Sequence, residues 1–265
     1  MLLTIDAGNT NTVFAVFDGD EIRGRWRIAT NSARTAEEYV VWLTQLMQLD
    51  GLALELVQDV MISTVVPEAL FNLQRLAQRY FKTEALNVGA PGVELGVDVR
   101  VDRPAEVGAD RKVNSLAAHE AYGGPAIVID FGTATTFDCV DTDGAYIGGV
   151  ISPGINLSLE ALHMASAQLP RIALSKPGQV IGKSTVPCMQ SGVFWGYIGL
   201  IEGIVARIRS EYGAPMKVIA TGGLATPLSE GTDLFDEIDQ DLTLKGLKSI
   251  YWRNRPERNP DVIAV

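Results

Sequence analysis

Apolar residues at the start of the chain fall into three short runs separated by polar turns. The runs cover residues 2–6, 12–18 and 21–29, and the second turn reads Asp18-Gly19-Asp20. Short apolar runs bounded by Gly, Asn and Asp are typical of β-strands joined by tight turns. The pattern therefore predicts a three-stranded meander over residues 2–29.

Helical spacing follows the meander and alternates with short strand patterns. Apolar side chains recur every three to four residues in the predicted helices 36–49, 68–80 and 110–122. Strands are expected at 60–65 and 85–88, and a strand-bearing connection at 89–104. Gly123-Gly124-Pro125 is a strong stop signal and marks the predicted domain boundary.

The second half of the chain repeats this plan. Strands are predicted at 126–130, 134–141, 145–151 and 216–220, with helices at 153–166 and 189–212. We expect an α/β protein of two domains, residues 1–122 and 123–265, each with a mixed five-stranded sheet flanked by helices. This plan resembles the ribonuclease H-like domains of the actin, sugar-kinase and heat-shock ATPase superfamily, and the resemblance implies an ATP cleft between the domains.

The two halves also share a polar turn. Asp, Gly and Thr recur in register at 6 and 130, at 8 and 132, and at 12 and 136. Backbone N–H groups in such a turn suit a phosphate, and the neighbouring Asp suits a cation. A third strand ends in Gly222-Gly223, where backbone could approach a base or ribose, although an ordinary strand-to-loop turn is the alternative.

Composition narrows the classes of partner and the compartment. A net charge of −10 disfavours nucleic acid, which binds clustered Lys and Arg. We expect Cys139 and Cys188 to be buried free thiols, which fits a reducing cytosol. No secretory signal is indicated, and the most apolar stretch, 192–201, is far shorter than the roughly 20 residues that span a bilayer. A cytoplasmic protein is predicted.

Six short motifs carry a closer resemblance, which spans the whole chain. They are Asp6 to Asn11, Glu106 to Arg111 followed by Asn114, Asp130 to Thr135, Gly148-Gly149 with Ser152 to Gly154, Gly182 to Thr185, and Leu242 to Leu247. Each motif alone is weakly specific, but their order and spacing resemble the type III pantothenate kinases. The resemblance implies transfer of the ATP γ-phosphoryl group to pantothenate, the first step of coenzyme A synthesis, by a homodimer.

The resemblance also implies roles for the pantothenate-binding residues. Asp110 would be the base that orients and deprotonates the acceptor hydroxyl, while a helix N-cap is its alternative or additional role. Arg111 would hold the pantothenate carboxylate through its planar guanidinium. Gly108 and Ala109 would line the pocket with backbone, and Thr185 would contact the substrate. Family members usually carry Tyr where this chain has Val101, which puts that one contact in doubt.

For the nucleotide, the resemblance implies ATP with Mg²⁺ and a monovalent cation, K⁺ or NH₄⁺. Asp6 would hold Mg²⁺, partly through water, and Asp130 the monovalent cation, although chemistry alone leaves a second magnesium site open there. The remaining cofactor-binding candidates surround the phosphates: Ala7, Gly8, Asn9, Thr10, Asn11, Thr12, Val13, Gly132, Thr133, Gly222 and Gly223.

Two other functions compete with pantothenate phosphorylation. A non-catalytic regulatory protein of the same fold is the runner-up, and a sugar or polyphosphate enzyme of the superfamily is the third. Gly182-Lys183-Ser184 is rejected as a P-loop because position 177, five residues before Gly182, is Pro. The four glycines of helix 189–212 suggest close backbone packing, either internal or in the dimer.

Overall fold

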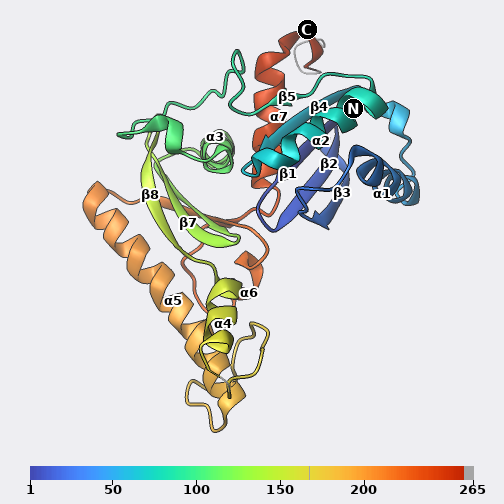
Figure 1. Cartoon of the computed structure of the whole chain (residues 1–265). Helices are drawn as coiled ribbons and strands as arrows, with labels where there is room; N and C mark the ends of the chain where they lie inside the picture. The colour runs from blue at the N-terminus through green and yellow to red at the C-terminus, as the bar shows by residue number, and fades with distance from the viewer. Residues whose placement is uncertain (167, 260–265) are drawn as a thin grey trace. The chain divides into compact units, whose positions relative to one another are not determined.

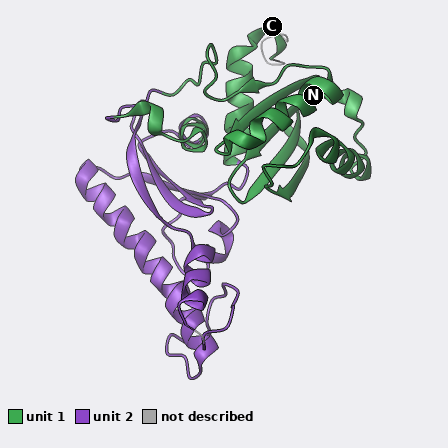
Figure 2. Ribbon diagram, viewed as in Figure 1, with its two compact units in different colours: residues 1–97, 103–117, 242–265 green, residues 98–102, 118–241 purple. Residues whose placement is uncertain are grey.

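The computed structural model describes residues 1–166 and 168–259 (Figure 1). The chain forms two compact units that are interleaved along the sequence (Figure 2). Unit 1 contains residues 1–97 and 103–117 and the C-terminal part from Leu242 onward, and unit 2 contains residues 98–102 and 118–241.

Unit 1 is built on a mixed five-stranded sheet with the order β3-β2-β1-β4-β5. Strands β1 to β3 form the antiparallel meander, and β4 and β5 add to β1 in parallel. The strands are β1 Leu2–Ala7, β2 Asn11–Asp18, β3 Glu21–Ala29, β4 Asp59–Thr64 and β5 Leu86–Asn87. The helices are α1 Ala36–Leu49, α2 Pro67–Leu76 with a π-turn at Ala77–Phe81, α3 Ala109–Tyr122, whose residues from Ala118 onward belong to unit 2, and α7 Leu242–Asn254. Short 3-10 turns lie at Leu54–Leu56, Pro104–Glu106 and Pro256–Arg258.

Helices cover both faces of this sheet, and alternation along β1 decides which residue faces which helix. Leu3 and Ile5 belong to a core cluster with residues of α1 and α2. Leu2 belongs to a second cluster on the opposite face, together with residues of β4, α3 and α7. Because side chains alternate along a strand, Asp6 shares its face with Leu2. The face that carries Asp6 is therefore the face covered by α3 and α7.

Unit 2 repeats the same sheet. Its order is β10-β9-β6-β7-β8, with an antiparallel meander β6-β7-β8 and parallel partners β9 and β10. The strands are β6 Ala126–Phe131, β7 Ala134–Val140, β8 Tyr146–Pro153, β9 Lys217–Thr221 and β10 Glu237–Ile238, and the helices are α4 Ile155–Met164, α5 Thr185–Tyr212 and α6 Ala225–Ser229. The predicted fold class, two mixed five-stranded sheets flanked by helices, is confirmed.

Helix α5 packs one side on this sheet. Phe194, Ile198 and Ile201 join the core cluster formed by β6, β7 and β9. By length and composition alone, α5 is also the one helix in the described part of the chain that could cross a membrane, with 33% of its most apolar window buried. The apolar stretch is thus longer than the sequence analysis expected, and the buried side is accounted for by packing within unit 2.

The structure corrects three local expectations and adds two helices, α6 and α7. Residues 89–104 hold no strand of a sheet, and an isolated bridge joins Val99 to Tyr146. Cys139 is buried and free as expected, but Cys188 is exposed, because it lies in the first turn of α5, which begins earlier than predicted. Helix α3 begins at Ala109, so Asp110 lies inside its first turn and is not its N-cap.

Helix α7 is the longer of the two added helices. The sequence analysis places residues 242–254 in the C-terminal domain, whereas in the structure α7 packs against β1 and β4 of unit 1. The predicted boundary between 122 and 123 itself stays a prediction.

Candidate active site

The β1–β2 turn of unit 1 is closed by its own backbone and supported by a neighbouring strand end. Gly8 N donates to Asn11 O at 3.0 Å. Thr30, immediately after β3, donates its hydroxyl to Gly8 O at 2.7 Å and lies 2.9 Å from the Thr12 hydroxyl. Its backbone N–H donates to Thr10 O at 2.9 Å. These hydrogen bonds connect residues 8–12 to one another and to the end of β3.

Asp6 lies at the end of β1, beside a buried hydroxyl. In the parallel pairing of β1 with β4, Asp6 is opposite Ser63, which is 1% exposed. The Ser63 hydroxyl oxygen is buried and has no hydrogen-bond partner within the protein. Buried polar atoms are normally paired, so an unpaired one beside a carboxylate indicates a missing ligand or water. This donor set fits Mg²⁺, which keeps several waters and takes few protein carboxylates.

The start of α3 fixes the conformation of Asp110. Its carboxylate accepts a hydrogen bond from the Arg111 backbone N–H at 2.8 Å. A Cβ atom at position 108 would lie 2.5 Å from Asp110 Oδ1, so this carboxylate position requires Gly108. Negative charge in the first turn is favoured by the helix dipole. Because residues of α3 pack on the face of the sheet that carries Asp6, unit 1 presents Asp6, Asp110 and Arg111 on one side of the sheet.

In unit 2, Asp130 is placed between two threonines. It pairs with Thr136 of β7 on one side and with Thr221 of β9 on the other. Residues directly opposite one another in a sheet carry their side chains on the same face. Thr136 in turn donates its hydroxyl to Asp138, a fully buried carboxylate, at 3.2 Å. The site is rich in oxygen atoms, the ligands that hard cations prefer.

Gly222 is required by the same carboxylate. Its φ is +86°, and a Cβ there would lie 2.6 Å from Asp130 Oδ1 and 2.8 Å from the backbone N and O of Phe131. From the sequence, we expect a base or ribose to lie against the backbone at Gly222. Within unit 2, the group that approaches Gly222 is the Asp130 carboxylate itself. A role of Gly222 and Gly223 toward the nucleotide stays a prediction.

The β6–β7 turn is tighter than its counterpart in unit 1. Gly132 N donates to Ala134 O at 3.0 Å, and both Gly132 and Thr133 are exposed. Gly154, the N-cap of α4, packs directly on the turn, because a Cβ there would lie 2.2 Å from Thr133 O. Thr185 is exposed at the first position of α5. The structure thus places the candidate residues of unit 2 on the β6–β7 turn, the β9 end and the α5 start.

Sequence reasoning missed two residues of these sites, Ser63 and Thr30. Neither belongs to a recognisable motif, and both become relevant only through strand pairing or turn contacts. Among residues 1–166 and 168–259, no group of three or more His, Cys, Asp and Glu side chains could hold a metal ion. The candidate cation sites therefore rest on single carboxylates supported by hydroxyls.

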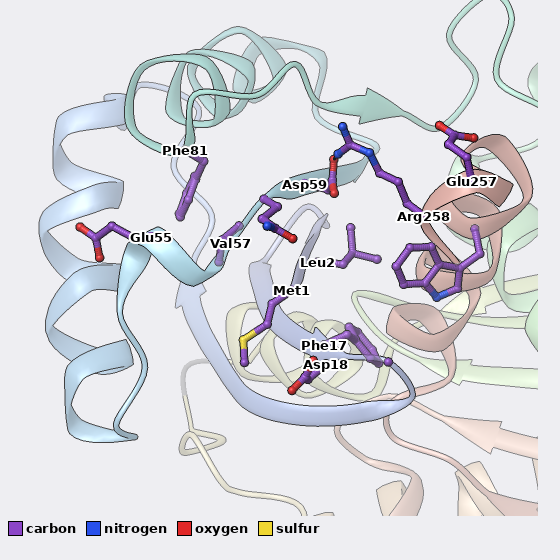
Figure 3. A pocket seen from close by; sticks show the side chains of 13 residues that line it. Met1, Leu2, Phe17, Asp18, Glu55, Val57, Asp59, Phe81, Glu257 and Arg258 are labelled. Atoms are coloured by element: carbon purple, nitrogen blue, oxygen red, sulfur yellow. The ribbon is translucent and has the colours of Figure 1, made fainter. Parts of the chain in front are cut away.

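A cavity of about 710 Å³ lies elsewhere in unit 1 (Figure 3). It is lined by Leu2 at the start of β1, so it opens at the end of the strand opposite to Asp6. Arg258 and Asp59 form an ion pair in its wall. None of the predicted site residues lines this cavity.

Comparison with known proteins now adds to this geometry. The sequence pattern of the family described as type III pantothenate kinase matches residues 2–207. A type III pantothenate kinase of Rhodospirillum rubrum is 61% identical over 257 residues, which cover 97% of this chain and 100% of the relative. The chain belongs to the type III pantothenate kinase family. A second member, from Paramagnetospirillum magneticum, is also 61% identical and covers 96% of this chain and 98% of its own.

Solved structures show the fold of the family at greater distance. A Baf family transcriptional activator from Campylobacter jejuni aligns with a TM-score of 0.60 at 19% identity, covering 96% of this chain and 99% of its own. A 2-dehydro-3-deoxygalactonokinase protein from Sinorhizobium meliloti aligns with a TM-score of 0.56 at 14% identity, covering 96% of each chain. At these identities the likeness concerns the fold, so the actin-like kinase architecture is confirmed and the regulatory alternative gains no support.

Proposed function

We propose that this member of the family phosphorylates pantothenate with ATP to give 4'-phosphopantothenate, the first step of coenzyme A biosynthesis. In this reaction the acceptor hydroxyl loses its proton, its oxygen bonds to the γ-phosphorus, and the bond from that phosphorus to the β-phosphate oxygen breaks to release ADP. The observation that carries the proposal is the Asp110 carboxylate, which Gly108 and the Arg111 N–H hold at the start of α3.

Asp110 is the proposed general base. Its carboxylate oxygens accept the acceptor hydroxyl and then its proton, while Arg111 binds the pantothenate carboxylate through parallel N–H donors. Gly108 and Ala109 offer backbone to the substrate, and Thr185 offers a hydroxyl. Val101 is half-buried and supplies an apolar contact where family members usually carry Tyr.

The nucleotide is assigned to the two turns. We assign the phosphates of ATP to residues 6–13 and to Gly132 and Thr133, and the base or ribose to Gly222 and Gly223. Asp6, with Ser63 beside it, would hold Mg²⁺, which neutralises charge on the phosphates when it is bound. Asp130, between Thr136 and Thr221, would hold K⁺ or NH₄⁺.

We also infer that the active form is a cytoplasmic homodimer that pairs through α5. Gly192, Gly196 and Gly199 are exposed, and apart from the adjacent residues and the backbone of α5 itself, a Cβ at each would meet no described atom within 4 Å, so these glycines do not serve packing against the rest of unit 2. A glycine face left open on an apolar helix suits the close approach of a second helix.

The test is ADP release with a panel of acceptors, namely pantothenate, sugars and polyphosphate, in the presence of Mg²⁺ and K⁺. We expect ADP release when pantothenate is the acceptor and none when a sugar or polyphosphate takes its place. Asp110→Asn should lower kcat by about a hundredfold to ten-thousandfold, the usual contribution of a positioned base. Asp233→Asn, a change at an exposed carboxylate of unit 2, is the control and should leave kcat unchanged. ATP binding without turnover on any acceptor would instead support the non-catalytic alternative.

A further inference from the structure

Helix α7 contacts α3 at two points, although the contacting residues are separated by about half of the chain. The Thr243 hydroxyl donates to Asn114 Oδ1 at 2.7 Å. One turn later, Gly246 is buried against α3, where a Cβ would lie 2.6 Å from Val113 O and 3.1 Å from the Ala117 side chain. Backbone at that distance cannot move aside without displacing α3 as a whole.

These contacts fall directly behind the proposed substrate residues. Asn114 follows Asp110 by four positions and Arg111 by three, so the three side chains lie along one side of α3. Asn114 is 1% exposed, and its oxygen is occupied by Thr243. A hydrogen bond to Asn114 therefore fixes the rotation of α3 about its own axis, and contact with Gly246 fixes its distance from α7.

A shared core fixes α7 in turn. Leu244, Leu247 and Ile250 pack in the same cluster as Val113 and Leu116 of α3, and this cluster includes residues of β1, β2 and β4. Helix α7 thus connects the start of α3 to the sheet whose first strand carries Asp6. The motif Leu242 to Leu247, which the sequence analysis connected with the family without a role, acquires one here.

We propose that Thr243 and Gly246 are positioning residues, which set the orientation of α3 and hence the binding of the phosphoryl acceptor. The proposal rests on the proposed function for its kinetic readout. Neither residue needs to touch substrate, because each acts through Asn114 or the α3 backbone. The affinity for the acceptor should depend on these contacts, and the affinity for ATP should not.

The deciding pair of variants is Thr243→Val, which removes the hydroxyl at nearly constant volume, and Thr243→Ser, which keeps it. For Thr243→Val we expect KM for pantothenate to rise about threefold to tenfold, the range of one hydrogen bond, with KM for ATP unchanged. Thr243→Ser should restore wild-type values within about twofold, since the hydroxyl is retained. Equal acceptor KM in both variants, or an equal rise in KM for ATP, would overturn the proposal.

A second variant and a second readout separate this proposal from the proposed function. Gly246→Ala should raise KM for pantothenate further, whereas Gly178→Ala, at an exposed glycine of unit 2 with nothing within 4 Å of an added Cβ, should not. Amide hydrogen exchange in residues 109–117 should be faster in Thr243→Val than in Thr243→Ser, whatever the acceptor. Wild-type protein inactive on pantothenate would sink the proposed function, while equal exchange in the two variants would sink the positioning role.

Discussion

The two Asp-x-Gly turns share strand order and register but differ in what surrounds the carboxylate. Asp6 has Val13 on one side and the buried Ser63 hydroxyl on the other, whereas Asp130 has Thr136 and Thr221. The turn of unit 1 is supported by Thr30 hydrogen bonds, and that of unit 2 by close contacts of Gly154 and Gly222. The two hairpins thus share one backbone plan, but the neighbouring strands surround the two carboxylates with different side chains.

The largest effect is expected at Asp6. Asp6→Asn should lower kcat by about a thousandfold, because a metal ion at a transferring phosphoryl group contributes several kcal/mol. Excess Mg²⁺ should recover part of the loss, and K⁺ none of it. Kinetics over a magnesium titration measure this. Asp18→Asn, at the far end of the same hairpin, is the control. Full activity of Asp6→Asn at ordinary Mg²⁺ would contradict the assignment.

Next in size is the difference between the glycines of the two sites. Gly222→Ala combines a φ of +86° with a contact at 2.6 Å to Asp130, and should lower the free energy of unfolding by about 2 to 4 kcal/mol. In Gly8→Ala the added Cβ would contact only Asn11 O, at 3.3 Å, so the free energy of unfolding should change by less than about 1 kcal/mol. Urea unfolding of both variants gives the comparison. Equal destabilisation would mean that the two turns are equally packed.

A smaller effect is expected at Asp130. Asp130→Asn should lower activity about tenfold to a hundredfold and abolish stimulation by K⁺ or NH₄⁺, as loss of a cation ligand would. Activity measured in K⁺, NH₄⁺ and Na⁺ decides this. Thr221→Val tests the neighbour and should weaken potassium affinity less than Asp130→Asn does. If potassium stimulated Asp130→Asn as strongly as the wild type, Asp130 would not be the ligand of the monovalent cation.

The smallest effect concerns Thr30. Thr30→Val removes the hydrogen bond to Gly8 O and should lower the free energy of unfolding by about 1 kcal/mol and weaken ATP binding severalfold. Thr30→Ser, which retains the donor, is the matched control. Calorimetric titration with ATP measures the binding. An unaltered ATP affinity in Thr30→Val would show that the turn of unit 1 keeps its conformation without this support.

Local sequence signals predicted most of the strands and helices well. Helix α1 matches its prediction because Thr35 and Glu38 form a capping box at its start, and Asp50 ends it. Helix α3 ends where predicted because Gly123 adopts a φ of +74°. The hairpins agree within one or two residues because apolar runs and turn residues change together.

Long-range pairing explains what the sequence could not predict. Ser63 becomes a site residue only because β4 pairs with β1 in one register, and a shift of one residue would turn it to the other face. Helix α7 was missed because its leucines contact unit 1, far away in the sequence. The space at Gly222 is filled by the Asp130 carboxylate, and β7, β8, α4 and α5 lie between the two residues in the sequence. Turn composition revealed the two hairpins, but the neighbours of each carboxylate come from tertiary structure.

The discontinuous make-up of unit 1 has a consequence for biosynthesis. As the nascent polypeptide leaves the ribosome, β1, β2 and β4 emerge early, but the apolar face that receives Leu244, Leu247 and Ile250 stays uncovered until α7 has been translated. Residues 118–241 are continuous and can fold first. A transcript broken before codon 242 would therefore yield a chain whose first unit lacks α7. Its exposed apolar surface would be bound by chaperones or expose the chain to proteases.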